Sequence, residues 1–349
     1  MTALQVLVVD DSAVMRQAMS ALLGGDMTVT TAADPFIAMM KMESLRPDVI
    51  VLDLEMPRMD GLTFLRKLMA ESPIPVVVCS SLTASSSELT MRALQLGAVD
   101  VVLKPKVRLG ETPSDSAIAL IETIRGAAQA RVGRLTDGRP PRPRLAIAPV
   151  LTPAFHGVPC HVVVAGASTG GTEVLRQFLD AMPADAPPIV IVQHMPERFT
   201  AAFARRLNET SAMEVREAGS GDLLKQGVAL IAPGDRHLTL MRKGASTFAV
   251  ALQNAPLVNR HRPSVDVLFS SAARTLSSAG IGVLLTGMGR DGAKGLLEMR
   301  HAGARTIVQD EATSVVFGMP RAAIEIEAAM HVVSDHALAR TVLEACAGG

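Results

Sequence analysis

LQVLVVDDS (residues 4–12) places a short apolar run directly before two aspartates, and this pattern decides the fold of the first half of the chain. Four more apolar runs follow, at residues 27–31, 49–52, 75–79 and 99–103, with helix-period segments such as 14–23 and 62–69 between them. Five strand–helix units in succession predict a parallel sheet with helices on both faces. In such sheets, functional side chains gather at the carboxyl ends of the strands.

Polar residues stand at four of these strand ends. They are Asp10 and Asp11 after the first strand, Asp53 after the third, Ser80 and Ser81 at the fourth, and Lys104 and Pro105 after the fifth. Three carboxylates at one edge repel one another unless a divalent cation lies among them, and oxygen ligands suit Mg²⁺. A nearby ammonium and hydroxyl would stabilise an incoming phosphoryl group. A single aspartate at a strand end often only caps a helix, but the pattern here recurs at four ends.

A change in composition separates the two halves of the chain. Between residues 125 and 144 there are six arginines and one acid, Asp137, and prolines occur at 140, 141, 143, 149, 153 and 159. Basic, proline-rich sequence without periodicity is typical of an extended linker. We therefore expect a domain at residues 1–125, a linker at 126–156 and a second domain at 157–349. The alternative for the charge run is a docking patch for an acidic partner.

The overall composition agrees with two globular domains and excludes several protein classes. The chain has 349 residues, 34 basic and 34 acidic side chains, and 48% hydrophobic residues. At ~150 residues per domain this predicts two domains, and the zero net charge argues against a nucleic-acid binder. No Trp or Tyr is present, which disfavours aromatic stacking sites.

Localisation and redox chemistry are also constrained by the sequence. The three cysteines, Cys79, Cys160 and Cys346, are too few and too scattered for a disulfide framework or a zinc site. The N-terminus has no signal-peptide pattern, and no apolar run reaches the ~20 residues needed to span a bilayer. We therefore expect a soluble, cytoplasmic protein.

The second half contains a glycine-rich turn between a strand and a helix. GASTGG (residues 166–171) follows the apolar run 161–165 and precedes the helical stretch 173–179. A dinucleotide fingerprint needs G-x-G-x-x-G, but residue 168 is Ser. The segment instead fits G-x-S-x-G, the nucleophile elbow, with Ser168 as nucleophile and the backbone N–H of Thr169 near an oxyanion. A phosphate-binding turn or a plain helix cap remains as the alternative for this motif.

A nucleophilic serine needs a base, and eight histidines are available. His194 is the best placed, because it directly follows the strand predicted at residues 189–193 and so lies at the carboxyl edge. His237 and His261, both in predicted turns or loops, remain possible bases.

The base in turn needs an orienting carboxylate. Asp291 lies in GMGRDG (287–292), after the strand predicted at 281–286, and Asp310 follows the strand predicted at 305–309. Spacing alone leaves both open. The resulting chain order of Ser, His and Asp differs from that of α/β-hydrolases, so the triad would be another convergent version.

The first half resembles the receiver domain of two-component response regulators. The matching motifs are VVDDS (8–12), DLEMPRMDG (53–61), CSS (79–81) and LKP (103–105). The resemblance implies a flavodoxin-like domain in which Asp53 accepts a phosphoryl group from a histidine kinase. It also implies Mg²⁺ held by Asp10, Asp11, Asp53 and the backbone carbonyl of Glu55, with Lys104 and the Ser80 hydroxyl close to the phosphoryl oxygens. Val101 stands where this family often has an aromatic switch residue.

The second half, together with the first, resembles the chemotaxis protein-glutamate methylesterase family, CheB. Six motifs occur in order: GASTGG (166–171), QHMPERFT (193–200), APGDRH (232–237), NRHRPSVD (259–266), LLTGMGRDG (284–292) and FGMPRAA (317–323). The resemblance implies a Rossmann-like, doubly wound esterase domain with Ser168 as nucleophile, His194 as base and Asp291 as orienting acid. It also implies an oxyanion hole from the backbone of Thr169 and Met288, and no cofactor for the esterase.

The function that this resemblance implies is demethylation of glutamate methyl esters, and deamidation of glutamines, on the cytoplasmic helices of chemoreceptors. The receiver domain is expected to cover the esterase cleft until Asp53 is phosphorylated. Neither nucleic-acid binding nor membrane insertion is expected.

Three other functions predict features that disagree with this sequence, which has a long output domain, no dinucleotide fingerprint and all three candidate triad residues. A DNA-binding regulator would have a short basic output domain. An oxidoreductase would have the dinucleotide fingerprint. A binding-only esterase would lack a triad member.

Overall fold

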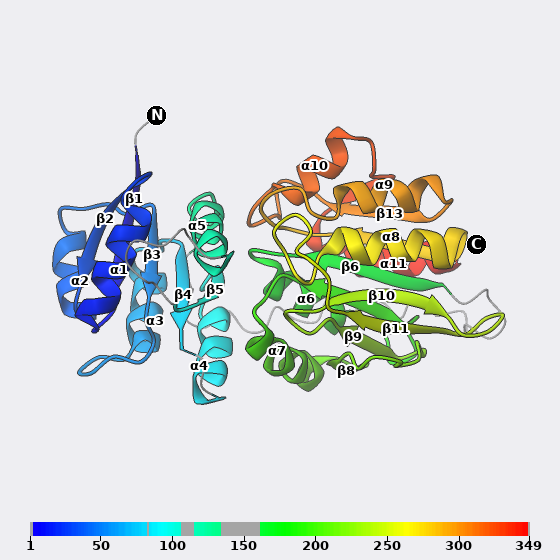
Figure 1. The fold of residues 1–349 in the computed structure, drawn as a ribbon, viewed down its shortest axis with the longest axis horizontal. Coiled ribbons are helices and arrows are strands. Elements are labelled where there is room, and N and C mark those ends of the chain that lie inside the picture. The colour runs from blue at the N-terminus through cyan, green and yellow to red at the C-terminus, as the bar shows by residue number, and fades with distance from the viewer. Residues whose placement is uncertain (1–2, 82–83, 106–114, 134–160, 348–349) are drawn as a thin grey trace.

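The computed structural model describes residues 3–81, 84–105, 115–133 and 161–347, which form two α/β domains (Figure 1). Cys160 and the proposed linker residues 134–156 lie outside these described residues, as does the expected start of the second domain at 157.

The first domain is a five-stranded parallel sheet, as predicted. Its strands are β1 (Leu4–Val9), β2 (Met27–Ala32), β3 (Val49–Leu52), β4 (Val76–Ser80) and β5 (Asp100–Leu103), in the order β2-β1-β3-β4-β5. Its helices are α1 (Ala13–Leu23), α2 (Pro35–Met42), α3 (Gly61–Glu71), α4 (Ala84–Gln95) and α5 (Asp115–Ala127). Side-chain oxygens of Ser12, Asp34 and Asp60 accept backbone N–H groups at the first turns of α1, α2 and α3, so polar residues after strands also start helices.

The C-terminal limit of this domain extends past the expected boundary at residue 125. Helix α5 continues to Ala127, which is fully buried. Ala128, Ala130 and Val132 then pack against the core of the first domain. Apolar residues at these positions therefore keep the chain on the receiver surface to the end of the described segment.

The second domain is built on a seven-stranded sheet in which every pair of neighbouring strands is parallel. Its strands are β6 (Val162–Ala167), β7 (Ile189–Gln193), β8 (Glu214–Glu217), β9 (Val228–Ile231), β12 (Gly280–Leu284), β13 (Arg305–Gln309) and β14 (His331–Val333). Its α-helices are α6 (Gly171–Asp180), α7 (Glu197–Thr210), α8 (Val265–Leu276), α9 (Ala293–His301), α10 (Met319–Glu325) and α11 (Leu338–Ala347).

An antiparallel hairpin, β10 (His237–Arg242) with β11 (Phe248–Gln253), lies outside this sheet and was not among the predicted elements. The hairpin is anchored to α8, because the backbone N–H of Leu240 donates to the Ser271 hydroxyl over 3.0 Å.

The strand order places a topological switch point in each domain. In the second domain the order β14-β13-β12-β6-β7-β9-β8 reverses direction between β12 and β6, and in the first domain the reversal lies between β1 and β3. Ligands of open α/β sheets bind beyond the carboxyl ends of the strands at such points. Ser168 and Asp291 follow β6 and β12, and Asp10, Asp11 and Asp53 follow β1 and β3.

The first domain presents α4, β5 and α5 to the second domain, on the side where α7 lies (Figure 1). Among the described residues, no helix is both long and apolar enough to cross a membrane.

Gly166 brings β6 and the start of α8 into close contact. A Cβ atom at position 166 would overlap both methyl groups of Val265, a fully buried residue at the first turn of α8. Interiors packed this tightly do not absorb an added methyl group without backbone shifts.

We expect Gly166→Ala to destabilise the second domain by about 1–3 kcal/mol, because overpacking forces apart strand and helix. Val265→Ala in the same chain should recover part of this loss, since it removes the overlapping methyl groups. Differential scanning calorimetry measures the change. Gly244→Ala is the control, because its Cβ would meet only Thr247 at 3.6 Å. Equal shifts for Gly166→Ala and Gly244→Ala would contradict the packing argument.

Candidate active site

Three adjacent strands of the second sheet deliver the predicted triad to one cleft. Ser168 follows β6, His194 follows β7, and Asp291 lies in the loop after β12. The backbone holds them in register: the His194 N–H donates to the Ala167 carbonyl over 3.0 Å, and the Ser168 N–H donates to the Thr286 carbonyl over 3.0 Å. All three residues line a cavity of about 810 Å³.

Gln193 connects the serine and histidine segments and was not among the predicted site residues. Its side-chain amide donates to the carbonyls of Ser168 over 3.0 Å and His194 over 3.1 Å, and the residue is 1% exposed. One buried amide therefore holds the backbones of both residues. A polar residue at the end of an otherwise apolar strand was the available signal.

His194 and Asp291 are joined by a hydrogen bond of 2.8 Å between Nε2 and Oδ2. Because an ionised carboxylate only accepts, Nε2 carries the proton and Nδ1 is left with a free lone pair. Nδ1 is buried without a hydrogen-bond partner among the described residues. The structure brings Ser168 into the same cavity but shows no hydrogen bond between Ser168 and His194 within the described segments.

The Asp291 carboxylate is 1% exposed and is surrounded by donors. Besides His194 these are the Asn259 amide at 2.7 Å, the Ser264 hydroxyl at 2.8 Å, and the backbone N–H groups of Val265 at 2.7 Å and Asp266 at 3.3 Å. Burial alone would raise the pKa of Asp291, but the hydrogen bonds from His194, Asn259 and Val265 outweigh it and hold the pKa well below its usual range. Asp291 is therefore ionised at neutral pH.

The alternative acid, Asp310, has a different role. Its carboxylate accepts from the backbone N–H and hydroxyl of Thr313, at 2.9 and 2.7 Å, and so closes a turn. It forms no hydrogen bond to a histidine in the described part of the chain.

The two alternative bases also differ in their surroundings. His237 is 1% exposed, and its ring nitrogens are paired with the Pro256 carbonyl and the Ser264 N–H. The His261 ring stacks on His194 with 3.7 Å between the ring centroids. Burial, and then the proximity of His194, lower the pKa of His261 to about 3, so this ring is neutral. His261 is thus part of the site, against the face of the predicted base.

The receiver domain covers this cleft. Residues of β5 and α5 line the cavity together with the triad, and Ser168 is only 7% exposed. The Thr169 hydroxyl donates to the Asp100 carboxylate over 2.7 Å, and the Gly170 N–H donates to the Val99 carbonyl over 3.2 Å. Burial raises the pKa of Asp100 to about 6, although the hydrogen bonds from Thr169 and Val101 oppose the shift. A receiver carboxylate therefore sits beside the predicted nucleophile.

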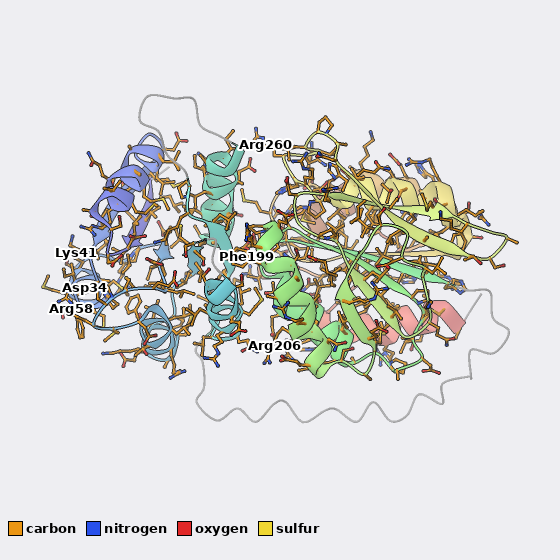
Figure 2. All side chains as sticks on the ribbon, turned by 60° about the horizontal axis from the view of Figure 1, so that its bottom comes forward. Asp34, Lys41, Arg58, Phe199, Arg206 and Arg260 are labelled. Carbon is orange, nitrogen blue, oxygen red and sulfur yellow. The ribbon has the colours of Figure 1, made fainter. Side chains whose placement is uncertain are left out.

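Further contacts join the domains around the cleft. Arg260 forms an ion pair with Glu122 of α5, at the boundary between the domains in Figure 2. The Ser87 hydroxyl of α4 donates to the Arg198 carbonyl of α7 over 3.3 Å. Gly126 of α5 lies against the side chain of Met288, so close that a Cβ there would meet its sulfur at 2.9 Å. The predicted oxyanion residues Thr169 and Met288 thus both contact the receiver, and their oxyanion role stays a prediction.

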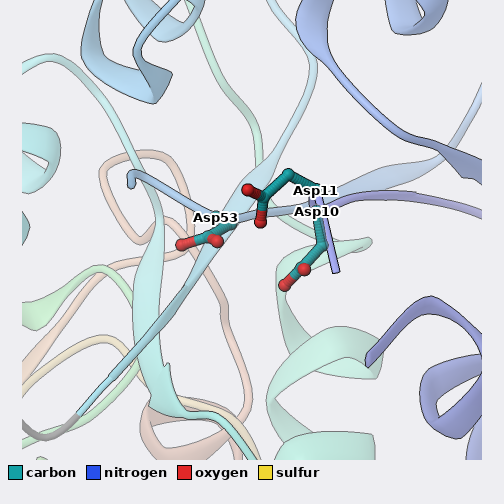
Figure 3. A group of neighbouring side chains, drawn as sticks. All are labelled: Asp10, Asp11 and Asp53. Atoms are coloured by element: carbon teal, nitrogen blue, oxygen red, sulfur yellow. The ribbon is translucent and has the colours of Figure 1, made fainter. Parts of the chain in front are cut away.

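The predicted phosphoacceptor cluster lies at the carboxyl edge of the receiver sheet. Ligand oxygens of Asp10, Asp11 and Asp53 lie within 4.8 Å of one another (Figure 3). Lys104 Nζ is 2.6 Å from Asp53 and 2.9 Å from Asp10. Burial raises the pKa of Asp53, while the contact with Lys104 opposes this. Burial would lower the pKa of Lys104, but its bonds to the two aspartates outweigh burial and raise the pKa. Three convergent carboxylates fit a hard divalent cation such as Mg²⁺.

Among the described residues, the Ser80 hydroxyl forms no hydrogen bond to Asp53, whereas the backbone N–H of Glu55 does. The Ser80 hydroxyl donates to the Ser81 carbonyl over 3.4 Å. The Glu55 side chain accepts from the Ser81 hydroxyl over 2.8 Å, while its N–H donates to Asp53 over 3.2 Å. Val101 is 4% exposed in β5 and lines the same cavity as Ser168, His194 and Asp291. The roles expected for Ser80 and for the Glu55 carbonyl therefore stay predictions.

Comparisons with known proteins agree with this arrangement of two domains. A family model described as CheB methylesterase matches residues 163–342, and one described as response regulator receiver domain matches residues 6–110. A protein-glutamate methylesterase/protein-glutamine glutaminase of Geobacter metallireducens is 51% identical, covering 99% of this chain and 100% of its own. One from Anaeromyxobacter dehalogenans is 54% identical, covering 97% of this chain and 98% of its own. The crystal structure of the Thermotoga maritima CheB methylesterase catalytic domain is 39% identical, with a TM-score of 0.52, and covers 53% of this chain and 97% of that one.

Proposed function

The chain belongs to the CheB methylesterase family, and from this premise we propose that Ser168, His194 and Asp291 carry out its ester hydrolysis. The protein is a protein-glutamate methylesterase and protein-glutamine glutaminase with a receiver domain, and its reaction is phosphorylation-regulated demethylation of chemoreceptors. The observation that supports the residue assignment best is the His194–Asp291 hydrogen bond in the cavity that Ser168 lines.

In the proposed acylation step, Ser168 Oγ attacks the γ-carbonyl carbon of a methylated glutamate while His194 Nδ1 takes the serine proton. The tetrahedral intermediate collapses, the bond to the methoxy oxygen breaks, and His194 gives its proton to that oxygen. Methanol leaves, and the glutamyl group stays on Ser168 as an ester. A glutamine side chain would lose ammonia by the same route.

Water completes the proposed cycle. His194 Nδ1 removes a proton from water, the hydroxide oxygen attacks the acyl carbon, and the bond to Ser168 Oγ breaks as the serine regains its proton. The products are a glutamate carboxylate and the free enzyme. Asp291 keeps the proton on Nε2 of His194 and stabilises the imidazolium that forms in each step. The backbone N–H groups of Thr169 and Met288 are proposed to stabilise the oxyanion.

The finer assignment of the receiver site is also part of the proposal. Asp53 accepts the phosphoryl group from a histidine kinase, and Lys104 neutralises its charge. Asp10, Asp11, Asp53 and the Glu55 carbonyl would hold Mg²⁺, which, when bound, neutralises charge at the phosphoryl oxygens. The substrates are proposed to be glutamates and glutamines on cytoplasmic receptor helices.

Strand β5 connects the proposed phosphorylation site to the esterase cleft over a short distance. Lys104 contacts Asp53 directly after β5, while Asp100 at the start of β5 contacts Thr169. A four-residue strand spans about 13 Å. Phosphorylation changes the partners of Lys104 at one end of β5, and we propose that the resulting shift weakens the contact of Asp100 at the other.

Ser168→Ala should abolish methanol release from methylated receptor membranes, because the Ser168 hydroxyl is the proposed nucleophile that forms the acyl-enzyme. The expected loss is at least about 10³-fold in kcat. The measurement is methanol release with and without a small phosphodonor. Ser211→Ala, which changes a serine outside the cleft, is the control. Turnover by Ser168→Ala near the level of that control would rule out Ser168 as the nucleophile.

Asp53→Asn should remove the stimulation of methanol release by acetyl phosphate, because the amide cannot accept the phosphoryl group. Chelation of Mg²⁺ should have the same effect on the unsubstituted protein. Asp48→Asn, at an exposed position of the same domain, should keep the stimulation. Full stimulation of Asp53→Asn would place the phosphoacceptor elsewhere.

Asp100 predicts a pH dependence of the unphosphorylated enzyme. Its pKa is about 6 in the closed arrangement, against an ordinary value of 3.8. The closed form therefore binds a proton between these values, so closure is favoured as the pH falls below 6 and disfavoured above it. Closure lowers the basal activity of the unsubstituted protein as the pH falls, whereas Asp100→Asn has no carboxyl group to bind the proton. We therefore expect the basal activity of the unsubstituted protein, divided by that of Asp100→Asn, to fall several-fold from pH 7.5 to pH 5. Taking the ratio cancels any pH dependence that the two proteins share, and a ratio that is constant or rises at low pH would contradict the prediction.

A further inference from the structure

The rim of the esterase cleft is rich in arginine on the side of the second domain. Arg198, Arg260, Arg262 and Arg290 all line the cavity that contains the triad. Arg262 is paired within its own domain, with Asp235 at 2.5 Å. Arg260 instead reaches across to Glu122 of the receiver, and it lies at the domain boundary where Figure 2 labels it.

The backbone holds Arg260 in an unfavourable conformation. Its φ angle is +66° and that of Asn259 is +51°, so two consecutive non-glycine residues are left-handed. Such residues persist only where their surroundings impose them, and they cluster at functional sites. Asn259 and Arg260 are the two central residues of a tight turn that Val258 and His261 close, and this turn geometry requires both left-handed conformations.

The residues on either side of Arg260 are attached to the predicted catalytic pair. The Asn259 amide donates to Asp291 Oδ1 over 2.7 Å, and the His261 ring stacks on His194. Two backbone hydrogen bonds between Val258 and His261, of 3.1 and 2.9 Å, close the loop. The position of Arg260 relative to the reacting centre is therefore fixed from both sides, although its side chain is 67% exposed.

The receiver residues at the cleft indicate which kind of group Arg260 can bind. Glu122 offers a carboxylate to Arg260, and Asp100 offers a second one to Thr169 beside Ser168. When the receiver moves away, Arg260 loses this partner and faces the opening through which a substrate must approach Ser168. A guanidinium at a fixed position recognises carboxylates through charge-assisted hydrogen bonds.

We propose that Arg260 binds a carboxylate of the substrate segment next to the reacting side chain, and that Glu122 occupies this position in the closed enzyme. The open enzyme then prefers a methylated glutamate that has an acidic neighbour. Arg260 is a specificity-determining residue in this view and does not touch the reacting atoms. The inference rests on the proposed function.

The test uses the full chain with Mg²⁺ and acetyl phosphate. Helical peptides carry a single glutamate γ-methyl ester and a Glu, Gln or Lys placed in turn three and four residues to either side, since these positions share a helix face. Methanol release gives kcat/KM for each peptide. At one of these positions the unsubstituted protein should prefer Glu over Gln by about three- to tenfold, as for a partly solvated ion pair. Raising the salt concentration should shrink the preference.

Charge reversal gives the decisive comparison. Arg260→Ala should remove the preference, and Arg260→Glu should invert it so that the Lys peptide becomes the better substrate. Arg340→Glu is the matched control: Arg340 is 63% exposed, pairs with Glu344 at 3.7 Å, and lies on α11 away from the cleft. This control should keep the original order of peptides. An order of peptides that is unchanged in Arg260→Glu would overturn the inference.

Failure of the inference and failure of the proposed function give different results. If the unsubstituted protein releases methanol neither from the peptides nor from methylated receptor membranes, the proposed function is wrong. If it demethylates the membranes but releases no methanol from the peptides, or releases methanol from all of them at the same kcat/KM, the proposed function stands and the role of Arg260 is rejected.

Discussion

The buried carboxylate of Asp291 is the point on which the esterase site depends. An ionised carboxylate at 1% exposure is tolerated only when hydrogen bonds replace its lost hydration. Here the donors come from His194, the loop at residues 259–261 and the first turn of α8. The same bonds that stabilise Asp291 therefore fix the tautomer of His194, the start of α8 and the loop that carries Arg260 and His261. Removing the charge would loosen all of these segments together.

The sequence could predict what depends on local pattern. Strand ends followed by Asp10, Asp53, Ser168 and His194 place these residues correctly, because parallel strands bring their carboxyl ends to one edge. Spacing does not distinguish Asp291 from Asp310 as the orienting acid; the family resemblance favours Asp291, and Asp291 is the one that forms a hydrogen bond to His194. The geometry of this pair lay beyond any local signal, since the two residues are 97 positions apart.

The contacts between the domains could not be predicted from either half. From the sequence alone, Asp100 has no feature that distinguishes it from other strand residues, and Glu122 has none that distinguishes it from other polar helix residues. Their roles depend on contacts with Thr169 and Arg260, which lie in the second domain. The hairpin β10–β11 was also missed, because it pairs outside the parallel sheet that the alternating pattern describes. Packing between separate units leaves no periodicity in the chain.

Within the described part of the chain, β5 pairs with one strand, β4, and forms the edge of the receiver sheet. A strand at the edge of a sheet can change the side-chain contacts at its two ends without disrupting hydrogen bonds to a second neighbouring strand. Substitutions at Asp100 can therefore change the contact between the two domains while the proposed phosphoacceptor site at Asp53 stays intact. Single substitutions at this contact can therefore change, during evolution, how strongly the esterase responds to the receiver. The residues of the two reaction sites need not change.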